Sequence, residues 1–213
     1  MFSDSDARGL ISVRVDGSAN DSLLADYLAA GLERDGLTVV TDDVARVDAQ
    51  VVAVDRTTLA DGLELLRAAR RRSGRCGLVC VSRARDVRLL GPGWDDRPTG
   101  TRFVAIPALS ETSELTDVVV SSVRSPLSER DPLEVRLPLT DAQLDVLVLI
   151  AEGRTNEEIA VARGTSEKAV RGMVGRMARS LELDAAEVNV RVALVRLLLG
   201  EEPAASNDAG AAA

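Results

Sequence analysis

The first 125 residues alternate short apolar runs with amphipathic segments of helical length. Strands that alternate with helices in this way indicate a parallel sheet whose crossovers are helices. The expected strands are 10–16, 37–40, 50–55, 77–81 and 102–106, and the expected helices are 21–35, 58–72 and 110–123. The pattern therefore predicts an α/β fold class for this region, a doubly wound five-stranded parallel sheet.

Two of the crossovers depart from this pattern. The second, 42–49, is too short for a full helix, and the fourth, 83–100, is rich in Gly, Pro and Asp, which is typical of a partly disordered loop. No helix is indicated in the fourth crossover beyond 83–90. Trp94 lies there, and we expect it to pin the loop in preference to lining a ligand site.

A different pattern runs from Leu139 to Leu183, where capping signals mark three short helices. Thr140 with Gln143, and Thr155 with Glu158, have the spacing of capping boxes. The expected helices cover about 141–152, then a short segment that stops at Gly164, and then a third helix capped by Ser166. With an apolar segment near 187–199, the sequence predicts a C-terminal four-helix domain of the all-α class.

The third helix divides into an apolar and a polar face. At helical spacing, one face carries Val170, Val174, Met177 and Leu181, and the opposite face carries Lys168, Arg171, Gly172, Gly175, Arg176 and Arg179. Each interior glycine weakens a helix by roughly 1 kcal/mol relative to alanine. Close approach to DNA would account for the glycines, whereas a plain packing role with solvated arginines is the alternative.

This segment resembles the LuxR/FixJ/NarL family of bacterial transcription regulators. The matches are Leu139, Thr140, Val146, Leu147, Ala151, Gly153, Asn156, Glu158, Ile159, Ala160, Ser166, Val170 and Leu181. The departures are Ala142, Gln143, Arg163, Thr165 and Met173. The resemblance implies sequence-specific binding of double-stranded DNA by a homodimer, with the helix near 187–199 in the dimer contact.

The resemblance also implies roles for individual residues. Arg171 would contact a phosphate or a base, and Gly172 and Gly175 would lie against the groove. Thr155 and Asn156 would hold a phosphate at the start of the second helix. The remaining DNA-binding candidates are the capping residue Ser166 and, from the helical wheel, Lys168, Arg176 and Arg179.

The N-terminal domain resembles the receiver domain of two-component response regulators, the usual partner of this DNA-binding module. Asp55 stands at the phosphoacceptor position and Ser82 at the hydroxyl position, but only Asp16 remains of the acidic pair. Ile106 replaces the lysine, so the receiver is degenerate and a Mg²⁺ cofactor is expected only if its pocket functions. Alternatively, Asp55 caps a turn through 56–58. Phe103 is expected in the core.

Composition bounds the remaining possibilities. The net charge is −8, but the segment 163–179 carries five basic residues and one acid, and local charge governs DNA binding. The chain has no histidine and only two cysteines, so a metal site is not expected. Cys76 and Cys80 are too far apart along a strand to form a disulfide with each other. Without a glycine-rich phosphate loop or a nucleophile–base pair, no enzymatic activity is expected. No signal peptide or membrane span is evident, which indicates a cytoplasmic protein.

The expected organisation is a receiver-like domain at 1–121, a linker at 122–138, a helix-turn-helix domain at 139–200 and a disordered tail at 201–213. The main hypothesis is a DNA-binding transcription regulator controlled independently of phosphorylation, through a small-molecule ligand, a partner protein or its own concentration. Two alternatives stay open: a response regulator that is phosphorylated on Asp55, and an adaptor that docks a transcription partner.

Overall fold

The computed structural model describes residues 11–17, 22–42, 46–128, 136–183 and 189–198. The chain divides into two compact units, Met1–Val135 and Arg136–Ala213. None of the described helices is both long and apolar enough to cross a membrane. The predicted tail at 201–213 lies outside the described residues.

The first unit contains a five-stranded sheet in the order β2-β1-β3-β4-β5, with every neighbouring pair parallel. The strands are β1 (Ser12–Gly17), β2 (Thr38–Val39), β3 (Ala49–Ala53), β4 (Gly77–Ser82) and β5 (Thr101–Ala105). This confirms the predicted doubly wound sheet. The strand order reverses between β1 and β3, and such a switch point is where ligands of open α/β sheets usually bind.

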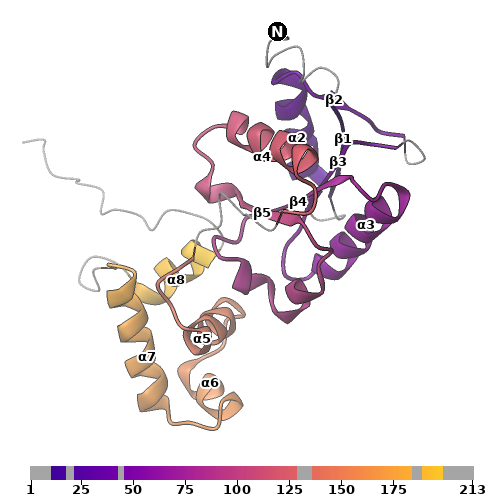
Figure 1. Cartoon of the computed structure of the whole chain (residues 1–213). Helices are drawn as coiled ribbons and strands as arrows, with labels where there is room; N and C mark the ends of the chain where they lie inside the picture. The colour runs from indigo at the N-terminus through magenta and orange to yellow at the C-terminus, as the bar shows by residue number, and fades with distance from the viewer. Residues whose placement is uncertain (1–10, 18–21, 43–45, 129–135, 184–188, 199–213) are drawn as a thin grey trace, which may run out of the picture. The chain divides into compact units, whose positions relative to one another are not determined.

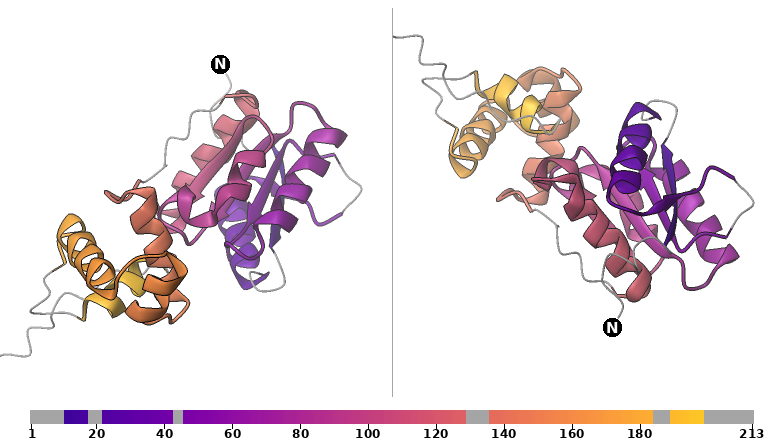
Figure 2. Two further views of the ribbon diagram at one scale, coloured as in Figure 1. Left: turned by 90° about the horizontal axis from the view of Figure 1, so that it is seen from below. Right: turned by 90° about the horizontal axis from the view of Figure 1, so that it is seen from above.

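Helices cover both faces of the sheet (Figures 1 and 2). Helices α2 (Ser22–Arg34) and α4 (Thr112–Arg124) pack on one face, and α3 (Leu59–Arg72) packs on the other. Every residue of β3, β4 and β5 is buried. Because both faces are covered, these strands are nearly continuous apolar runs, which is why the sequence revealed them so clearly.

The fourth crossover is ordered, so the prediction of partial disorder was wrong. It forms two short 3₁₀ helices, η1 (Val87–Leu90) and η2 (Pro92–Asp96), in place of the longer helix suggested for 83–90. Trp94 is 7% exposed, and its ring meets that of Phe103 edge-on, with centroids 5.6 Å apart. Both expectations, that Trp94 pins the loop and that Phe103 is core, are confirmed.

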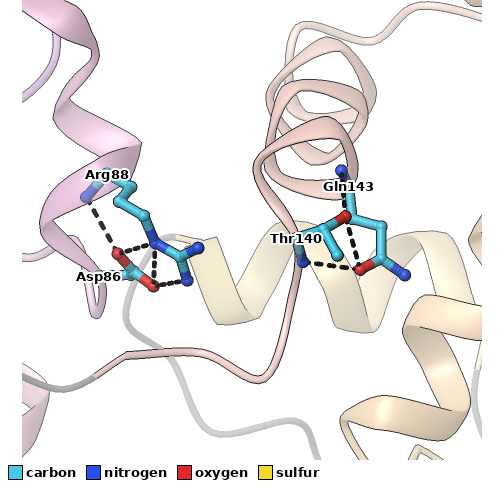
Figure 3. A network of polar contacts seen from close by, with 4 residues as sticks. All are labelled: Asp86, Arg88, Thr140 and Gln143. Atoms are coloured by element: carbon cyan, nitrogen blue, oxygen red, sulfur yellow. Dashed lines mark hydrogen bonds and ion pairs between the residues drawn. The ribbon is translucent and has the colours of Figure 1, made fainter.

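A buried carboxylate begins this crossover. Asp86 is fully buried, and its side chain accepts hydrogen bonds from the backbone N–H of Arg88 and from the guanidinium of the same residue, at 2.6–3.2 Å (Figure 3). The contact satisfies the first turn of η1, as an N-cap does. Together with Trp94 it explains why a Gly- and Pro-rich segment keeps one conformation.

Helix α4 extends past the predicted boundary between the receiver-like domain and the linker. It continues to Arg124, three residues into the range predicted as the linker, and Ser122 is fully buried. Ser122 packs so closely on Gly77 that a Cβ at Gly77 would lie 2.3 Å from the Ser122 hydroxyl. Residues 122–124 are therefore part of the first unit.

The described part of the second unit contains four helices, as predicted. They are α5 (Asp141–Ala151), α6 (Asn156–Ala162), α7 (Glu167–Ser180) and α8 (Val190–Leu198). Both predicted capping boxes form, and the one at Thr140 and Gln143 is visible in Figure 3. The core is built from side chains of all four helices: Leu147, Ile159, Met177 and Leu194 are each fully buried.

Candidate nucleic-acid interface and receiver-like pocket

Helix α7 is positioned by its own N-terminal signals and by two buried anchors. The hydroxyl of Ser166 accepts a hydrogen bond from the Ala169 N–H at 3.2 Å. Gly164 adopts φ +61°, a conformation that favours glycine, and so allows the tight turn between α6 and α7. Val170 and Met177 fix the inner face of α7 in the core.

All six predicted residues of the polar face of α7 are exposed: Lys168, Arg171, Gly172, Gly175, Arg176 and Arg179. We call this set the α7 face. An added Cβ at Gly175 would meet no atom within 4 Å, and one at Gly172 would meet only the Arg176 guanidinium, at 3.5 Å. Among the described residues, no neighbour packs closely enough to require a glycine at either position.

The single acid of the segment 163–179 lies beside the α7 face. Glu167 accepts a hydrogen bond from Arg171 at 2.7 Å, and both side chains are more than half exposed. Exposed ion pairs of this kind contribute about 0–1 kcal/mol. Arg171 therefore remains available to a phosphate or a base. The i,i+4 spacing of the two residues was visible in the sequence.

Thr155 and Asn156 are engaged within the unit. The Thr155 backbone N–H and hydroxyl donate hydrogen bonds to the Glu158 carboxylate, which lower the pKa of that carboxyl, and the same hydroxyl accepts one from the Glu158 N–H. The Asn156 side-chain oxygen accepts a hydrogen bond from Arg191 of α8 at 2.8 Å, and Arg191 also donates to the Arg154 carbonyl. Their predicted phosphate contacts stay a prediction. Arg191, 35 residues along the chain from Asn156, gave no local signal in the sequence.

The three receiver-like residues lie at the carboxyl ends of three neighbouring strands. Asp16 is on β1, Asp55 follows β3, and Ser82 ends β4. The Asp16 carboxylate accepts a hydrogen bond from the buried Gln50 side chain at 2.7 Å, and the buried Ser82 hydroxyl accepts one from the Ala84 N–H at 3.2 Å. The fold brings the three strand ends together, but these contacts bind each side chain to a near neighbour.

Asp55 is the most strongly engaged of the three. Its Oδ1 accepts four hydrogen bonds, from the backbone N–H and the hydroxyl of both Thr57 and Thr58, at 2.7–3.0 Å. Partial burial raises the pKa of the carboxyl, and the four hydrogen bonds outweigh it, so the pKa lies below its ordinary value. The predicted turn cap at 55–58 is confirmed.

The residues present do not fit a Mg²⁺ site of the receiver type. Within the described ranges, no group of three or more Asp, Glu, Cys or His side chains could hold a metal ion. Gly17 contributes no carboxylate beside Asp16, and Mg²⁺ in proteins prefers a near-octahedral set of oxygen ligands. Cys76 and Cys80 are buried, and they form no disulfide with each other.

Solved response regulators resemble this chain over most of its length. The RcsB–DNA complex is 14% identical, covers 89% of this chain and 98% of its own, and has a TM-score of 0.45. ChrA from a haem-sensing two-component system is 18% identical over 89% of this chain and 96% of its own, with a TM-score of 0.41. RcsB of Salmonella typhimurium is 14% identical over 88% and 97%, with a TM-score of 0.39.

No protein-family model matches the chain, and no curated protein matches it either. Since the TM-scores are below 0.5, the likeness to these response regulators decides nothing about function. The functional assignment therefore depends on this chain's own residues.

Proposed function

We propose that this protein is a sequence-specific, homodimeric DNA-binding transcription regulator of the LuxR/NarL type, with a degenerate receiver domain. The observation that carries the proposal is the α7 face. It places four cationic side chains, Lys168, Arg171, Arg176 and Arg179, in solvent on one side of a helix that follows a tight turn. A helix presented in this way can enter the major groove, with arginine and lysine contacting phosphates and guanine.

The two glycines support the same proposal by a separate route. Each weakens α7 by about 1 kcal/mol relative to alanine. No neighbouring atom would oppose an alanine Cβ at Gly175. A surface that must approach DNA closely gives such glycines a use, because a side chain at that point would hold the helix away from the groove.

Under this proposal, the protein is controlled independently of phosphorylation of Asp55. One oxygen of the Asp55 carboxylate, Oδ1, already receives four hydrogen bonds from its own turn, so the side chain serves as a turn cap. Ile106 stands where the resemblance expects a lysine, so no cation at that position would neutralise a phosphoryl group.

Enrichment of genomic DNA tests the DNA-binding part. Purified protein is mixed with fragments of its own genome, and bound fragments are recovered and sequenced, with Arg171→Ala in parallel. The matched control is Arg75→Ala, which removes an exposed arginine from the first unit. We expect a shared, two-fold related motif for wild type and the control, and its loss in Arg171→Ala. Failure of wild-type protein to enrich any motif would refute the proposal.

Beryllofluoride with Mg²⁺ tests the control part, because the pair mimics a phosphorylated aspartate. We expect the sedimentation coefficient and the DNA affinity to stay unchanged when it is added. A change in either that disappears in Asp55→Asn would instead establish the phosphorylation-responsive alternative.

A further inference from the structure

The first unit contains a cavity of about 460 Å³ between α3 and the fourth crossover. Its volume lies in the range of small-molecule sites, roughly 300–1,000 Å³. Leu59, Leu63 and Leu90 line it and are themselves almost fully buried, so they form an apolar floor. The glycines and proline of 91–93 form one wall, and the N-terminal half of α3 forms the other.

The charges around the cavity favour a cation. Its lining contains two arginines, Arg56 and Arg67, and three acids, Asp61, Glu64 and Asp96. Arg67 is already committed, because one guanidinium nitrogen binds Glu64 at 2.7 Å and the other donates to the Asp96 carbonyl at 2.7 Å. Apart from the Arg67–Glu64 pair, the lining carries one positive charge, on Arg56, and two exposed carboxylates, on Asp61 and Asp96.

The crossover that forms one wall of the cavity is joined by hydrogen bonds to the segment that follows α4. Arg70, one turn beyond Arg67 on α3, donates to the Thr99 carbonyl at the end of the crossover. The same guanidinium nitrogen donates to the Pro126 carbonyl, also at 2.9 Å. Gly100, at φ +76°, lies so close to Pro126 that a Cβ there would be 2.1 Å from its carbonyl oxygen.

Residues 125–127 follow α4, and a second arginine contacts their start. Arg102 is 3% exposed and donates to the Ser121 hydroxyl and carbonyl at 2.7 and 2.9 Å, at the last turn of α4, and to the Ser125 carbonyl at 3.5 Å. Residues 125–127 are therefore held against the end of the crossover and the start of β5.

We propose that the cavity between α3 and the fourth crossover binds a small organic cation with a short apolar body, and that Arg70 passes its binding to residues 125–127. The apolar body lies on the leucine floor, and the cationic group meets Asp61 and Asp96. Any effect of the cation on DNA binding would rest on the proposed function. Binding of the cation in the cavity, and its effect on residues 125–127, concern the first unit alone.

The binding half is tested with full-length protein and 2-phenylethylamine, followed by backbone amide NMR shifts. The comparison probe is phenylacetate, which has a similar body and the opposite charge. We expect saturable shifts at Arg56–Asp61 and at Gly91 and Gly93 with the amine, and binding about tenfold weaker with the carboxylate. No shift at these residues, or equal binding of the two probes, would overturn the site.

A filled cavity supplies the matched variant. An added Cβ at Gly93 would meet only Leu59, at an ordinary 3.5 Å, so Gly93→Leu places a side chain in the cavity without backbone strain. Gly74→Leu adds the same side chain where a Cβ has open space. We expect Gly93→Leu to abolish the amine-dependent shifts and Gly74→Leu to keep them. Identical titrations of both variants would contradict the proposal.

The coupling half is tested with Arg70→Met, which keeps a long side chain and removes the nitrogen that donates to both the Thr99 and the Pro126 carbonyls. We expect the amine to shift the amides of Ser125 and Leu127 in wild type. In Arg70→Met the shifts at Gly91 and Gly93 remain, and those at 125–127 disappear. No shift at 125–127 in saturated wild type would refute the coupling. DNA is absent from these measurements, so their outcome is separate from that of the DNA enrichment.

Discussion

The α7 face and the carboxyl edge of the sheet are the two places where the sequence gathers candidate functional residues, and they differ in where their hydrogen bonds go. The side chains at the sheet edge are bound to neighbours within the first unit: Asp16 accepts a hydrogen bond from Gln50, and Asp55 accepts hydrogen bonds from Thr57 and Thr58. The cations of the α7 face are exposed, and Arg171 has only an exposed partner, Glu167.

This difference separates residues that stabilise the fold from residues that can bind a partner. A carboxylate oxygen that receives four hydrogen bonds from its own turn stabilises that turn, so the loss of the carboxylate affects folding first. An exposed arginine contributes little to folding, so its loss affects binding first. Substitutions in the first unit should therefore change stability, and those on the α7 face should change DNA affinity.

The largest effect is expected for Trp94→Ala. Trp94 packs on Phe103 and lies 4.9 Å from the Arg97 guanidinium, so its removal leaves a core cavity and should lower the free energy of unfolding by about 3–5 kcal/mol. Urea unfolding followed by far-ultraviolet circular dichroism measures this. Trp94→Phe, the control, should lose much less. A loss below about 1 kcal/mol would show that the crossover is not anchored by this ring.

Arg171→Ala should come next, with its effect on binding. Affinity for the enriched DNA motif should fall by about 1–3 kcal/mol if Arg171 contacts a base. Fluorescence anisotropy at fixed salt measures it. The midpoint of thermal unfolding should hardly move, since the ion pair with Glu167 is exposed. A large loss of stability with unchanged DNA affinity would show that Arg171 stabilises the fold and does not contribute to DNA binding.

Asp55→Ala should lower the free energy of unfolding by about 1–2 kcal/mol near neutral pH, because four hydrogen bonds are lost. The pKa of Asp55 is lowered in the folded protein below 3.8, so its stabilisation is present above that pH and is lost as the pH falls through the folded pKa. The difference from wild type should thus shrink in acid. Asp26→Ala, which removes an exposed acid on α2, is the control for the loss of a surface carboxylate.

The smallest effect, with opposite signs in two assays, is expected for Gly175→Ala. The substitution should stabilise α7 by about 1 kcal/mol, and it should weaken DNA binding if the backbone lies against the groove. Gly164→Ala is the contrast, because φ +61° there makes an alanine destabilising. Thermal unfolding and anisotropy measure the pair. Unchanged DNA affinity in Gly175→Ala would remove the close-approach explanation.

Local signals predicted most of the fold because they act over a few residues. The capping boxes at Thr140 and Thr155 placed α5 and α6 to within a residue. The fourth crossover was predicted poorly, because its order depends on Trp94 meeting Phe103 from another strand. The start of the linker was placed too early for the same reason, since Ser122 is buried against Gly77 of β4.

The sequence by itself determined the two-part organisation, the parallel sheet and the cationic side of α7, because hydrophobic period and capping depend on neighbours along the chain. Only the tertiary structure decided which polar groups are engaged. The bonds from Gln50 to Asp16, from Arg191 to Asn156 and from Arg70 to Pro126 join residues 34, 35 and 56 positions apart. Such pairings depend on packing in three dimensions, which no short-range pattern in the chain records.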